Sequence, residues 1–366
     1  MTGNVLGERF KIVSFGESHG KVVGVVIDGC PAGLRLSEED VQKELDLRKP
    51  GSTTISTTRK ERDEVEILSG VFEGYTTGAP ICMLVRNEDV DSEPYREFLR
   101  KPRPGHADYV ARVKYGGFND WRGGGRFSGR ITAGFVMAGA VAKKLLLETM
   151  GVEVIAYTVE VAGVRAKGFT LEEARRFRYE NEVRAPTMES AERMMREIIR
   201  AREEGDSVGG IVECQALNLP IGLGEPVFST LEGELSKAIF SIPGVKGVEF
   251  GSGFSCSRMR GSENNDQYEV RDSRVTFRSN NSGGIIGGIS NGMPILLRVA
   301  FKPTSSIPKP QLTVDLESMK EAELRIKGRH DPCIVPRAVP VVEAMVAVVL
   351  ADHALRAGFI PPVLRR

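Results

Sequence analysis

The chain has 366 residues, of which 41% are hydrophobic and 27% are charged, proportions typical of a soluble globular protein. Lysine and arginine total 50 while aspartate and glutamate total 49, which argues against a general nucleic-acid or membrane-surface binder, because such proteins usually carry excess positive charge. The five cysteines have no CxxC spacing, so we expect free thiols in a reducing compartment and neither disulfides nor a metal site.

No targeting or membrane segment is predicted. The first 20 residues contain neither a long apolar core nor a cleavage signature. The longest strongly apolar run, around 341–351, contains Glu343 and is too short to span a bilayer. We therefore expect a cytoplasmic protein that has no membrane partner and no nucleic-acid partner.

The N-terminal part begins with two β-branched, apolar runs at 10–15 and 21–29, which predict a hairpin with GESHG (16–20) at its bend. Ser37 begins a predicted helix that has an acidic first turn and stops before Pro50. The next expected elements are a loop or edge strand at 52–58, strands at 64–72 and 80–86, a Pro/Gly-rich loop at 101–108, a buried helix at 133–150 and an alternating strand at 152–164.

A charged section at 165–207 follows, in which 170–182 and 186–205 have helical periodicity, with Thr187 as a cap and Gly205 as an end. The last expected elements are a strand at 208–220, a helix at 230–241, a strand beginning at 247, a Gly-rich loop at 280–292, a strand directly after it and a helix at 339–358. This order predicts an α+β fold, layered as β-α-β. Because no clean linker interrupts the chain, we expect a single domain over residues 1–366.

The most distinctive stretch is RGGGRFSGRIT at 122–132, where three arginines and two hydroxyls lie among four glycines. Glycine lets a ligand approach the main chain closely, and arginine offers a planar fork of donors. The apolar helix predicted directly afterwards would add an N-terminus that favours an anion. The stretch therefore predicts a site for a small oligoanionic, phosphorylated ligand, although a solvated basic loop is the alternative.

Three of the four histidines lie in turn-rich polar contexts, where a histidine can act as an acid or a base near neutral pH. They are His19 in GESHG, His106 in RPGHAD and His330 in GRHDP, whereas His353 lies in an apolar helix and is expected to be structural. FKPTSS at 301–306 combines one lysine with three hydroxyls, a combination suited to binding a phosphate or a ribityl chain.

Several familiar patterns are absent. GESHGK has three residues between its glycines, and Val22 follows the lysine, so it does not fit a nucleotide-binding P-loop. No GxGxxG follows a predicted strand, no GxSxG elbow has convincing partners, and no histidine or cysteine cluster has metal spacing.

Taken together, the motifs resemble those of the chorismate synthase family, in the expected order and across nearly the whole chain. The motifs are GESHG (16–20), DLRKPG (46–51), RPGHAD (103–108), GGGRFSGRITAG (123–134), SGGIIGGISNG (282–292), KPTSS (302–306) and GRHDPCIVPRAVPVVEAM (328–345).

The resemblance implies a single-domain β-α-β sandwich that assembles as a homotetramer. It implies the last common step of the shikimate pathway, which leads to the aromatic amino acids: a lyase removes phosphate from 5-enolpyruvylshikimate 3-phosphate by 1,4-trans-elimination and gives chorismate. Reduced FMN is required without net redox change, and NADPH is a candidate reductant. A substrate with one phosphate and two carboxylates fits the arginine-rich inventory.

The resemblance also assigns roles residue by residue. His19 matches the histidine that protonates the leaving phosphate, His106 the one that manages flavin protonation, and Asp331 the aspartate near the flavin's reactive nitrogen. The positions that match substrate contacts are Ser18, Arg48, Arg103, Ser128, Arg130 and Arg329. The positions that match FMN contacts are Arg126, Phe127, Ser128, Pro243, Gly244, Gly287, Lys302, Pro303, Thr304, Ser305, Ser306 and Arg329.

Three positions depart from many relatives. Phe127 replaces a serine and so removes any side-chain hydroxyl contact there, while Thr54 replaces an arginine, for which Arg59 is an open substitute. Pro243 and Gly244 stand where an asparagine-alanine pair is common.

Two other classes of function stay open at this point. One is an FMN-dependent NAD(P)H oxidoreductase on the same scaffold. The other is a non-catalytic protein that binds phosphoanions or RNA, against which the balanced charge counts.

Overall fold

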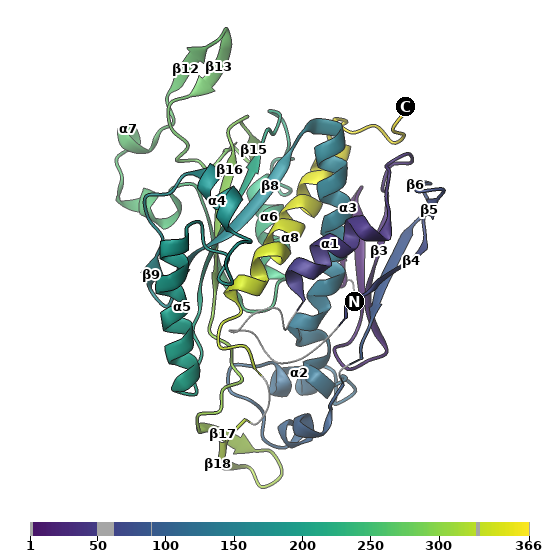
Figure 1. Ribbon diagram of the computed structural model, residues 1–366, viewed down its shortest axis with the longest axis vertical. Coiled ribbons are helices and arrows are strands. Elements are labelled where there is room, and N and C mark those ends of the chain that lie inside the picture. Colours follow the sequence, from purple (N-terminus) through teal and green to yellow (C-terminus); the bar gives the residue numbers. More distant parts are fainter. Residues whose placement is uncertain (1–2, 50–61, 89, 327–329, 366) are drawn as a thin grey trace.

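A computed structural model describes residues 3–49, 62–88, 90–326 and 330–365. Two five-stranded antiparallel sheets enclose a layer of helices (Figure 1), which confirms the predicted α+β, layered β-α-β architecture. The largest hydrophobic cluster reaches from Phe10 to Ile360 and includes buried residues of both sheets and of the helices between them. The expected single domain stays a prediction.

The first sheet is built from the N-terminal quarter of the chain. Its strands, in spatial order, are β1 (Val5–Leu6), β2 (Lys11–Gly16), β3 (Val22–Asp28), β7 (Ile81–Arg86) and β4 (Val65–Ser69). The predicted β2–β3 hairpin is confirmed: Gly16 pairs with Val23, so GESHG lies at its bend. This placement brings His19 to one edge of the helical layer.

The second sheet comes from the C-terminal half. Its strands, in spatial order, are β11 (Val245–Phe250), β16 (Ile295–Phe301), β10 (Gly210–Leu217), β8 (Glu153–Val161) and β9 (Val164–Arg165). β16 alternates buried and half-buried residues along its whole length, as expected for a strand with one face on the core. The loop that follows β16 and the loop that precedes β11 lie side by side, because both line the cavity described below.

The central layer consists of α3 (Thr132–Met150) and α8 (Val335–Arg356), which pack against each other. α3 also packs on β3, while α8 packs on β8 and β10. At their crossing, an ideal Cβ on Gly139 would lie 2.2 Å from the Cβ of Ala344. Glycine therefore sets how closely the two helices approach.

The other helices cover the sheets or lie at the ends of the molecule. They are α1 (Glu38–Arg48), α2 (Asp108–Lys114), α4 (Leu171–Phe177), α5 (Met188–Glu203), α6 (Leu231–Phe240) and α7 (Gly261–Asn264), with 3-10 turns η1 (Glu93–Leu99), η2 (Arg122–Phe127), η3 (Gly129–Ile131) and η4 (Gly253–Arg258). α1 packs on α3 and α8, so that Arg48 in its last turn is delivered to the central layer.

Four small hairpins complete the fold. They are β5–β6 (Val71–Phe72, Tyr75–Thr76), β12–β13 (Tyr268–Arg271, Arg274–Phe277), β14–β15 (Ile285–Ile286, Ile289–Ser290) and β17–β18 (Gln311–Asp315, Lys320–Leu324). In Figure 1 the β12–β13 hairpin projects from the upper end, and α2 and β17–β18 form a lobe at the lower end.

Most predicted elements are confirmed, with several corrected boundaries. Residues 64–72 turn at Gly70, which has φ +84°, so two short strands replace the one expected. The strand expected at 152–164 ends at Val161 and turns through Ala162 and Gly163, both at positive φ. The helix expected at 170–182 ends at Phe177, and the C-terminal helix begins at Val335 instead of 339.

The α2 helix and the β12–β13 and β17–β18 hairpins were not expected, because their strands are short and mostly exposed and so lack a core-facing pattern. The stretch 52–58 lies outside the described residues.

α8 is the one described helix that is long and apolar enough to cross a membrane, with a mean hydropathy of 1.8. However, 94% of its apolar window is buried inside the protein. It also carries two buried carboxylates. Glu343 accepts a hydrogen bond from the backbone of Ala156 in β8, and Asp352 accepts one from the backbone of Phe10, directly before β2. We interpret α8 as the core helix of a layered fold.

Gly139→Ala should destabilise the protein, although alanine is the better helix former. The added methyl group would overlap Ala344, and relief requires the two central helices to move apart. We expect the free energy of unfolding in urea to fall by about 1–3 kcal/mol. Gly261→Ala is the matched control, because a Cβ there meets nothing within 4 Å. Equal stability of the two variants would contradict the close crossing.

Candidate functional site

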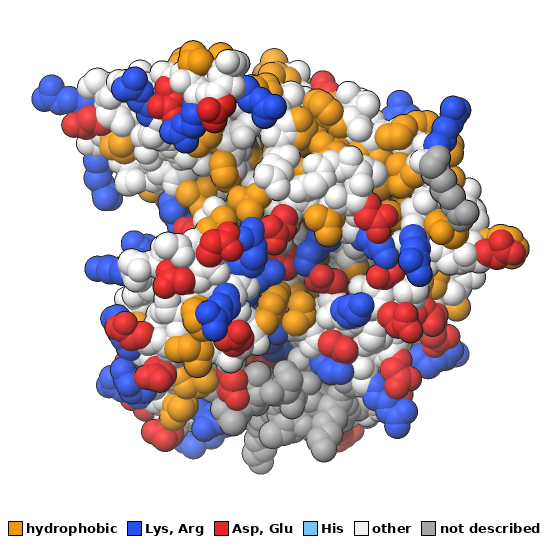
Figure 2. Space-filling model, turned by 45° about the horizontal axis from the view of Figure 1, so that its top comes forward, with side chains coloured by type: hydrophobic (Ala, Val, Ile, Leu, Met, Phe, Trp, Pro, Cys, Tyr) orange, Lys and Arg blue, Asp and Glu red, His pale blue; other side chains and the backbone are white. Residues whose placement is uncertain are grey.

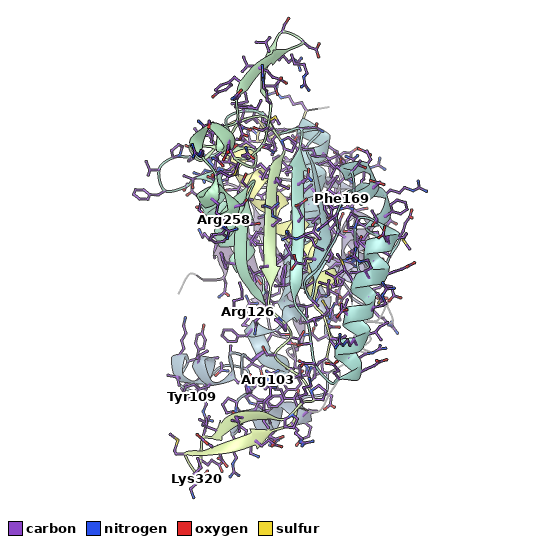
Figure 3. All side chains as sticks on the ribbon, turned by 90° about the vertical axis from the view of Figure 1, so that its left-hand side faces the viewer. Arg103, Tyr109, Arg126, Phe169, Arg258 and Lys320 are labelled. Atoms are coloured by element: carbon purple, nitrogen blue, oxygen red, sulfur yellow. The ribbon has the colours of Figure 1, made fainter. Side chains whose placement is uncertain are left out.

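A cavity of about 550 Å³ lies where the ends of both sheets meet the central helices. Among the described residues, its wall contains seven lysine or arginine side chains and a single carboxylate, that of Asp331. In Figure 3, Arg126 marks the end of the sheets and Arg103 lies below it, towards the lobe that carries Tyr109 and Lys320. A concave site with this charge suits an oligoanionic ligand.

The cavity gathers most of the residues that the motifs predicted. They come from α1, the 101–108 loop, the η2 and η3 turns, the start of β11, the loop after β16 and the start of α8. The predicted residues on its wall are Arg48, Arg103, His106, Arg126, Phe127, Ser128, Arg130, Pro243, Gly244, Lys302, Pro303, Thr304, Ser305, Ser306 and Asp331.

Two consecutive glycines lie against His19 and against His106, of which His106 itself lines the cavity. Gly123 and Gly124 have φ +59° and +81°, values that L side chains rarely adopt. An ideal Cβ on Gly123 would lie 2.2 Å from Cδ2 of His19, and one on Gly124 would lie 3.2 Å from Cε1 of His106. The two imidazoles therefore lie directly against this piece of backbone, and only glycine leaves room for them.

Each of these histidines is also held at its Nδ1 atom. His19 Nδ1 lies 2.9 Å from Ser92 Oγ, and its ring makes an edge contact with Tyr95 at 5.2 Å between centroids. His106 Nδ1 lies 2.8 Å from Asp108 Oδ1. In both rings Nε2 is on the side that faces the glycines. Nε2 of His19 would lie 2.5 Å from an ideal Cβ on Gly123, and Nε2 of His106 would lie 3.4 Å from one on Gly124.

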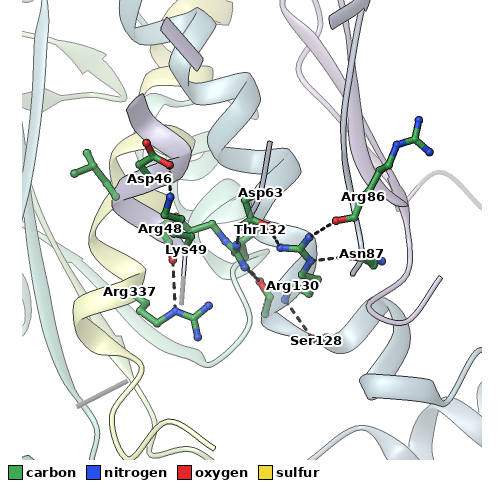
Figure 4. A network of polar contacts seen from close by, with 12 residues as sticks. Asp46, Arg48, Lys49, Asp63, Arg86, Asn87, Ser128, Arg130, Thr132 and Arg337 are labelled. Atoms are coloured by element: carbon green, nitrogen blue, oxygen red, sulfur yellow. Dashed lines mark hydrogen bonds and ion pairs between the residues drawn. The ribbon is translucent and has the colours of Figure 1, made fainter. Parts of the chain in front are cut away.

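A buried carboxylate joins two of the predicted substrate arginines (Figure 4). Asp63 accepts from Arg48 Nη1 at 2.9 Å and also forms an ion pair with Arg130. All three side chains are at least 95% buried. Burial alone would raise the pKa of Asp63, but the charges of Arg48 and Arg130 outweigh it and lower that pKa.

Further bonds fix the same two guanidinium groups. Arg48 Nε donates to Thr132 Oγ1 at 3.0 Å, and Arg130 Nε donates to Asn87 Oδ1 at 2.8 Å. Arg337, in the first turn of α8, donates from Nε to the Arg48 carbonyl at 3.5 Å and from Nη1 to Asp331 at 2.5 Å. The anion-facing side of the cavity is thus rigid before any ligand arrives.

The loop after β16 supplies further positive charge to the cavity wall. Lys302 Nζ donates to the Gly105 carbonyl at 2.6 Å and lies 2.5 Å from Ser305 Oγ. Burial, and then the nearby charge of Lys246, lower the pKa of Lys302. Thr304 Oγ1 is buried without a hydrogen-bond partner among the described residues. A buried hydroxyl in this state calls for a ligand atom or a water.

Three of the predicted positions that the structure describes are not on the cavity wall. Ser18 and His19 lie just behind it, with Ser18 donating from its backbone to the Gly125 carbonyl at 3.3 Å. Gly287 lies in the β14–β15 turn, away from the wall. Arg329 lies outside the described residues, as do Thr54 and Arg59.

The sequence interpretation missed several residues of the site. Asp108 stands two residues after His106, a spacing that could have drawn notice, and Arg337 lies within a quoted motif. Asp63 stands in the charged run KERDEVE, which is typical of a solvent-exposed segment, so no signal pointed to it. Tyr95 and Lys246 also line the cavity.

Neither a metal site nor a nucleic-acid partner was expected from the sequence. Among the described residues, no group of three or more histidine, cysteine or carboxylate side chains could hold a metal ion. Figure 2 shows acidic and basic side chains mixed over much of one face, with no uniform basic stripe on it.

A family model of chorismate synthases matches residues 10–355. A chorismate synthase of Korarchaeum cryptofilum is 63% identical over 97% of this chain and 98% of its own, and one of Dehalococcoides mccartyi is 57% identical over 99% and 100%. A crystal structure of a chorismate synthase superposes with a TM-score of 0.75 at 33% identity, covering 95% of this chain and 92% of the other.

Asp63→Asn should lower stability at neutral pH by about 3–5 kcal/mol, because it removes the charge that two buried guanidinium groups face. Since the folded pKa of Asp63 lies below its unfolded value of about 3.9, its contribution is complete above that pH and is lost as the pH falls through the folded pKa. The difference between wild type and variant should therefore shrink below about pH 4.

Urea unfolding at pH 7, 5 and 3 measures this difference. Asp28→Asn, at an exposed carboxylate that ends β3, is the control and should change stability by less than about 0.5 kcal/mol at each pH. A penalty for Asp63→Asn that stays constant down to pH 3 would argue against the charged arrangement.

Proposed function

Because the chain belongs to the chorismate synthase family, we propose that it is a carbon–oxygen lyase that converts 5-enolpyruvylshikimate 3-phosphate into chorismate by 1,4-trans-elimination of phosphate. The observation that carries this proposal is the pair of histidines that lie against Gly123 and Gly124, at a cavity whose described wall carries seven cationic side chains. Elimination of a phosphate needs a proton donor for the leaving group and positive charge around it.

We assign five of these cations to two ends of the site. Arg48, Arg130 and Arg337 form one end, held by Asp63 and Asp331. Arginine recognises phosphate and carboxylate through paired donors, so this end suits the phosphate and carboxylates of the substrate. Lys302, with Lys246 nearby, forms the other end, beside the buried hydroxyl of Thr304.

The second end fits reduced FMN. The volume of about 550 Å³ lies in the usual range of cofactor sites, and the unpartnered Thr304 hydroxyl offers a donor to a phosphate or ribityl oxygen. We propose that Lys302, Thr304, Ser305 and the Arg126–Ser128 backbone hold this cofactor. When bound, reduced FMN supplies transient electron density as the allylic C–O bond breaks, with no net redox change.

His19 is the proposed acid for the departing phosphate. Its Nδ1 is held by Ser92 and its Nε2 faces the thin glycine wall, so the reactive nitrogen has a short path to the cavity. The phosphate leaves with the electron pair of the C–O bond, and a proton held at Nε2 can neutralise it.

His106 and Asp331 are proposed to manage the other proton. A hydrogen must leave carbon as the new double bond forms, and both side chains line the cavity. Asp331 is fixed by Arg337 at 2.5 Å, and His106 is fixed by Asp108 at 2.8 Å.

The finer features of the proposal rest on the family. They are a role in the shikimate pathway, a homotetrameric assembly, a cytoplasmic location and NADPH as a candidate reductant. The β12–β13 hairpin leaves Val270 and Val275 exposed, which supports an additional subunit contact.

The first experiment is an anaerobic assay with 5-enolpyruvylshikimate 3-phosphate and chemically reduced FMN. We expect equal release of phosphate and chorismate with reduced flavin and none with oxidised flavin. Steady NAD(P)H oxidation without chorismate would support the FMN-dependent oxidoreductase instead, and it would make Phe127, which replaces a hydroxyl, the first residue to revert to serine.

Gly123→Ala should reduce kcat by about 100-fold or more, because the new methyl group would displace the His19 ring from the wall. The same loss is expected for His19→Ala and His106→Ala. Far-UV circular dichroism and the unfolding midpoint check that the variants fold, and Gly261→Ala serves as the matched control. Full activity of Gly123→Ala would show that His19 does not act through this wall.

A further inference from the structure

We propose that Asp108, at the start of α2, is a positioning residue that keeps the ring proton of His106 on Nδ1 and so leaves Nε2 available at the cavity wall. Only the catalytic use of His106 rests on the proposed function. The placement of the proton follows from the contacts of the side chains themselves.

Two contacts of His106 compete for its Nδ1 atom. Asp108 Oδ1 lies 2.8 Å from Nδ1, and Arg103 Nη2 lies 3.0 Å from it. A carboxylate oxygen can only accept and a guanidinium nitrogen can only donate, so the two contacts require opposite states of Nδ1. They cannot both be hydrogen bonds in one tautomer.

The carboxylate decides between these states. Arg103 Nη2 has another acceptor, since it donates to Asp108 Oδ1 at 2.7 Å. Asp108 Oδ1 would in contrast face a lone pair on Nδ1 if the ring proton were on Nε2. The Nδ1–H form satisfies both groups, because Arg103 and His106 then donate to the same carboxylate.

Asp108 is well placed to stay ionised. Burial would raise its pKa, but the hydrogen bonds from Arg103 and His106 outweigh this and hold the pKa well below its usual range. Arg103 donates to Asp108 from its backbone at 3.0 Å and from Nε at 2.8 Å, in addition to the Nη2 contact. The acceptor therefore stays an acceptor throughout the ordinary pH range.

Arg103, which holds Asp108, is itself fixed by other side chains. Arg103 is 5% exposed, donates to Ser306 Oγ at 3.1 Å and stacks its guanidinium over Phe98 at 4.5 Å from the ring centroid. Such second contacts commonly fix the orientation and tautomer of a functional imidazole. The chain Phe98, Arg103, Asp108, His106 thus runs from a small core to the cavity wall.

The His106 side chain borders two cavities. The ring lines the main cavity and also a side chamber of about 260 Å³ beneath α2. Next to Nε2 lie the backbone of Gly124 and Arg103 Nη2, which is 3.4 Å from it and would donate to it in the Nδ1–H form. A proton accepted at Nε2 can therefore come from either space.

His19 is held differently. Its partner at Nδ1 is the Ser92 hydroxyl, which can donate or accept, so this contact allows either tautomer. The contact with Ser92 thus does not fix the His19 proton in the way that the contact with Asp108 fixes that of His106. Asp108 also lies in the first turn of a helix and neutralises Arg103, so a test must separate positioning from simple structural support.

The direct test is the ¹⁵N NMR spectrum of the histidine side chains in the apoprotein near pH 8, above the usual titration range of imidazole. Four histidines make assignment by single substitution practical. We expect the Nδ1–H form for His106 in wild type and a mixture or the Nε2–H form in Asp108→Asn. A wild-type His106 with its proton on Nε2 would overturn the proposal, whatever the protein catalyses.

Activity gives the second readout. Asp108→Asn should lower kcat by about 10–100-fold and change KM by less than about threefold, while Asp108→Glu should recover part of the loss. An effect on KM alone, or an unchanged kcat, would contradict a positioning role. If Asp108→Asn does not fold, the wild-type spectrum and Asp108→Glu still decide.

Asp315→Asn is the matched control. Asp315 accepts from Arg100 Nε at 2.9 Å and from Nη2 at 2.6 Å, so it forms the same kind of fork in the same lobe without touching a histidine. We expect this variant to keep the His106 tautomer and to keep kcat within about twofold. A comparable loss in both variants would show that the lobe, and not the imidazole contact, is what Asp108 supports.

Discussion

The structure depends most on the burial of Asp63 between Arg48 and Arg130. A cavity meant for several negative charges must hold positive charge without a ligand, and buried like charges repel strongly. One carboxylate with two guanidinium partners reduces that cost and at the same time ties α1 to the turn that precedes α3. The price is a site that is stable only while Asp63 is ionised, which links the integrity of the cavity to the pH range in which its ligands are charged.

The second constraint is steric, and it concerns the glycine wall. Gly123 and Gly124 adopt positive φ, and each gives its space to one imidazole ring. The same backbone segment then enters η3 and α3, the helix whose Gly139 permits the close crossing with α8. Gly123 and Gly124 thus leave space for the two imidazoles, and Gly139 permits the close approach of α3 and α8. One continuous segment of the chain therefore shapes both the core and the site.

The sequence predicted the layers because the strands and helices of the core follow strict burial patterns. β3, α3 and β16 have nearly the predicted bounds. Peripheral elements such as α2 and β17–β18 were missed, since exposed residues leave no periodic signal. The motifs predicted most of the wall, but Asp63 and Asp108 act through partners that the fold brings to them, and a charged run such as KERDEVE gives no indication of burial.

The arginines of the site are ordered before an anion binds, and this lowers the entropy cost of binding. Arg48, Arg103 and Arg130 are each 5% exposed or less and are fixed by bonds to other parts of the chain. Their side-chain entropy is lost when the protein folds and not when an anion binds, so less of the binding free energy is spent on ordering the site. Donors that are already oriented also stabilise charge as it develops on a leaving phosphate, because the surroundings need not reorganise during the reaction. The oriented arginines and the imidazoles next to Gly123 and Gly124 therefore fit the same step of the proposed reaction, the departure of an anion together with its proton.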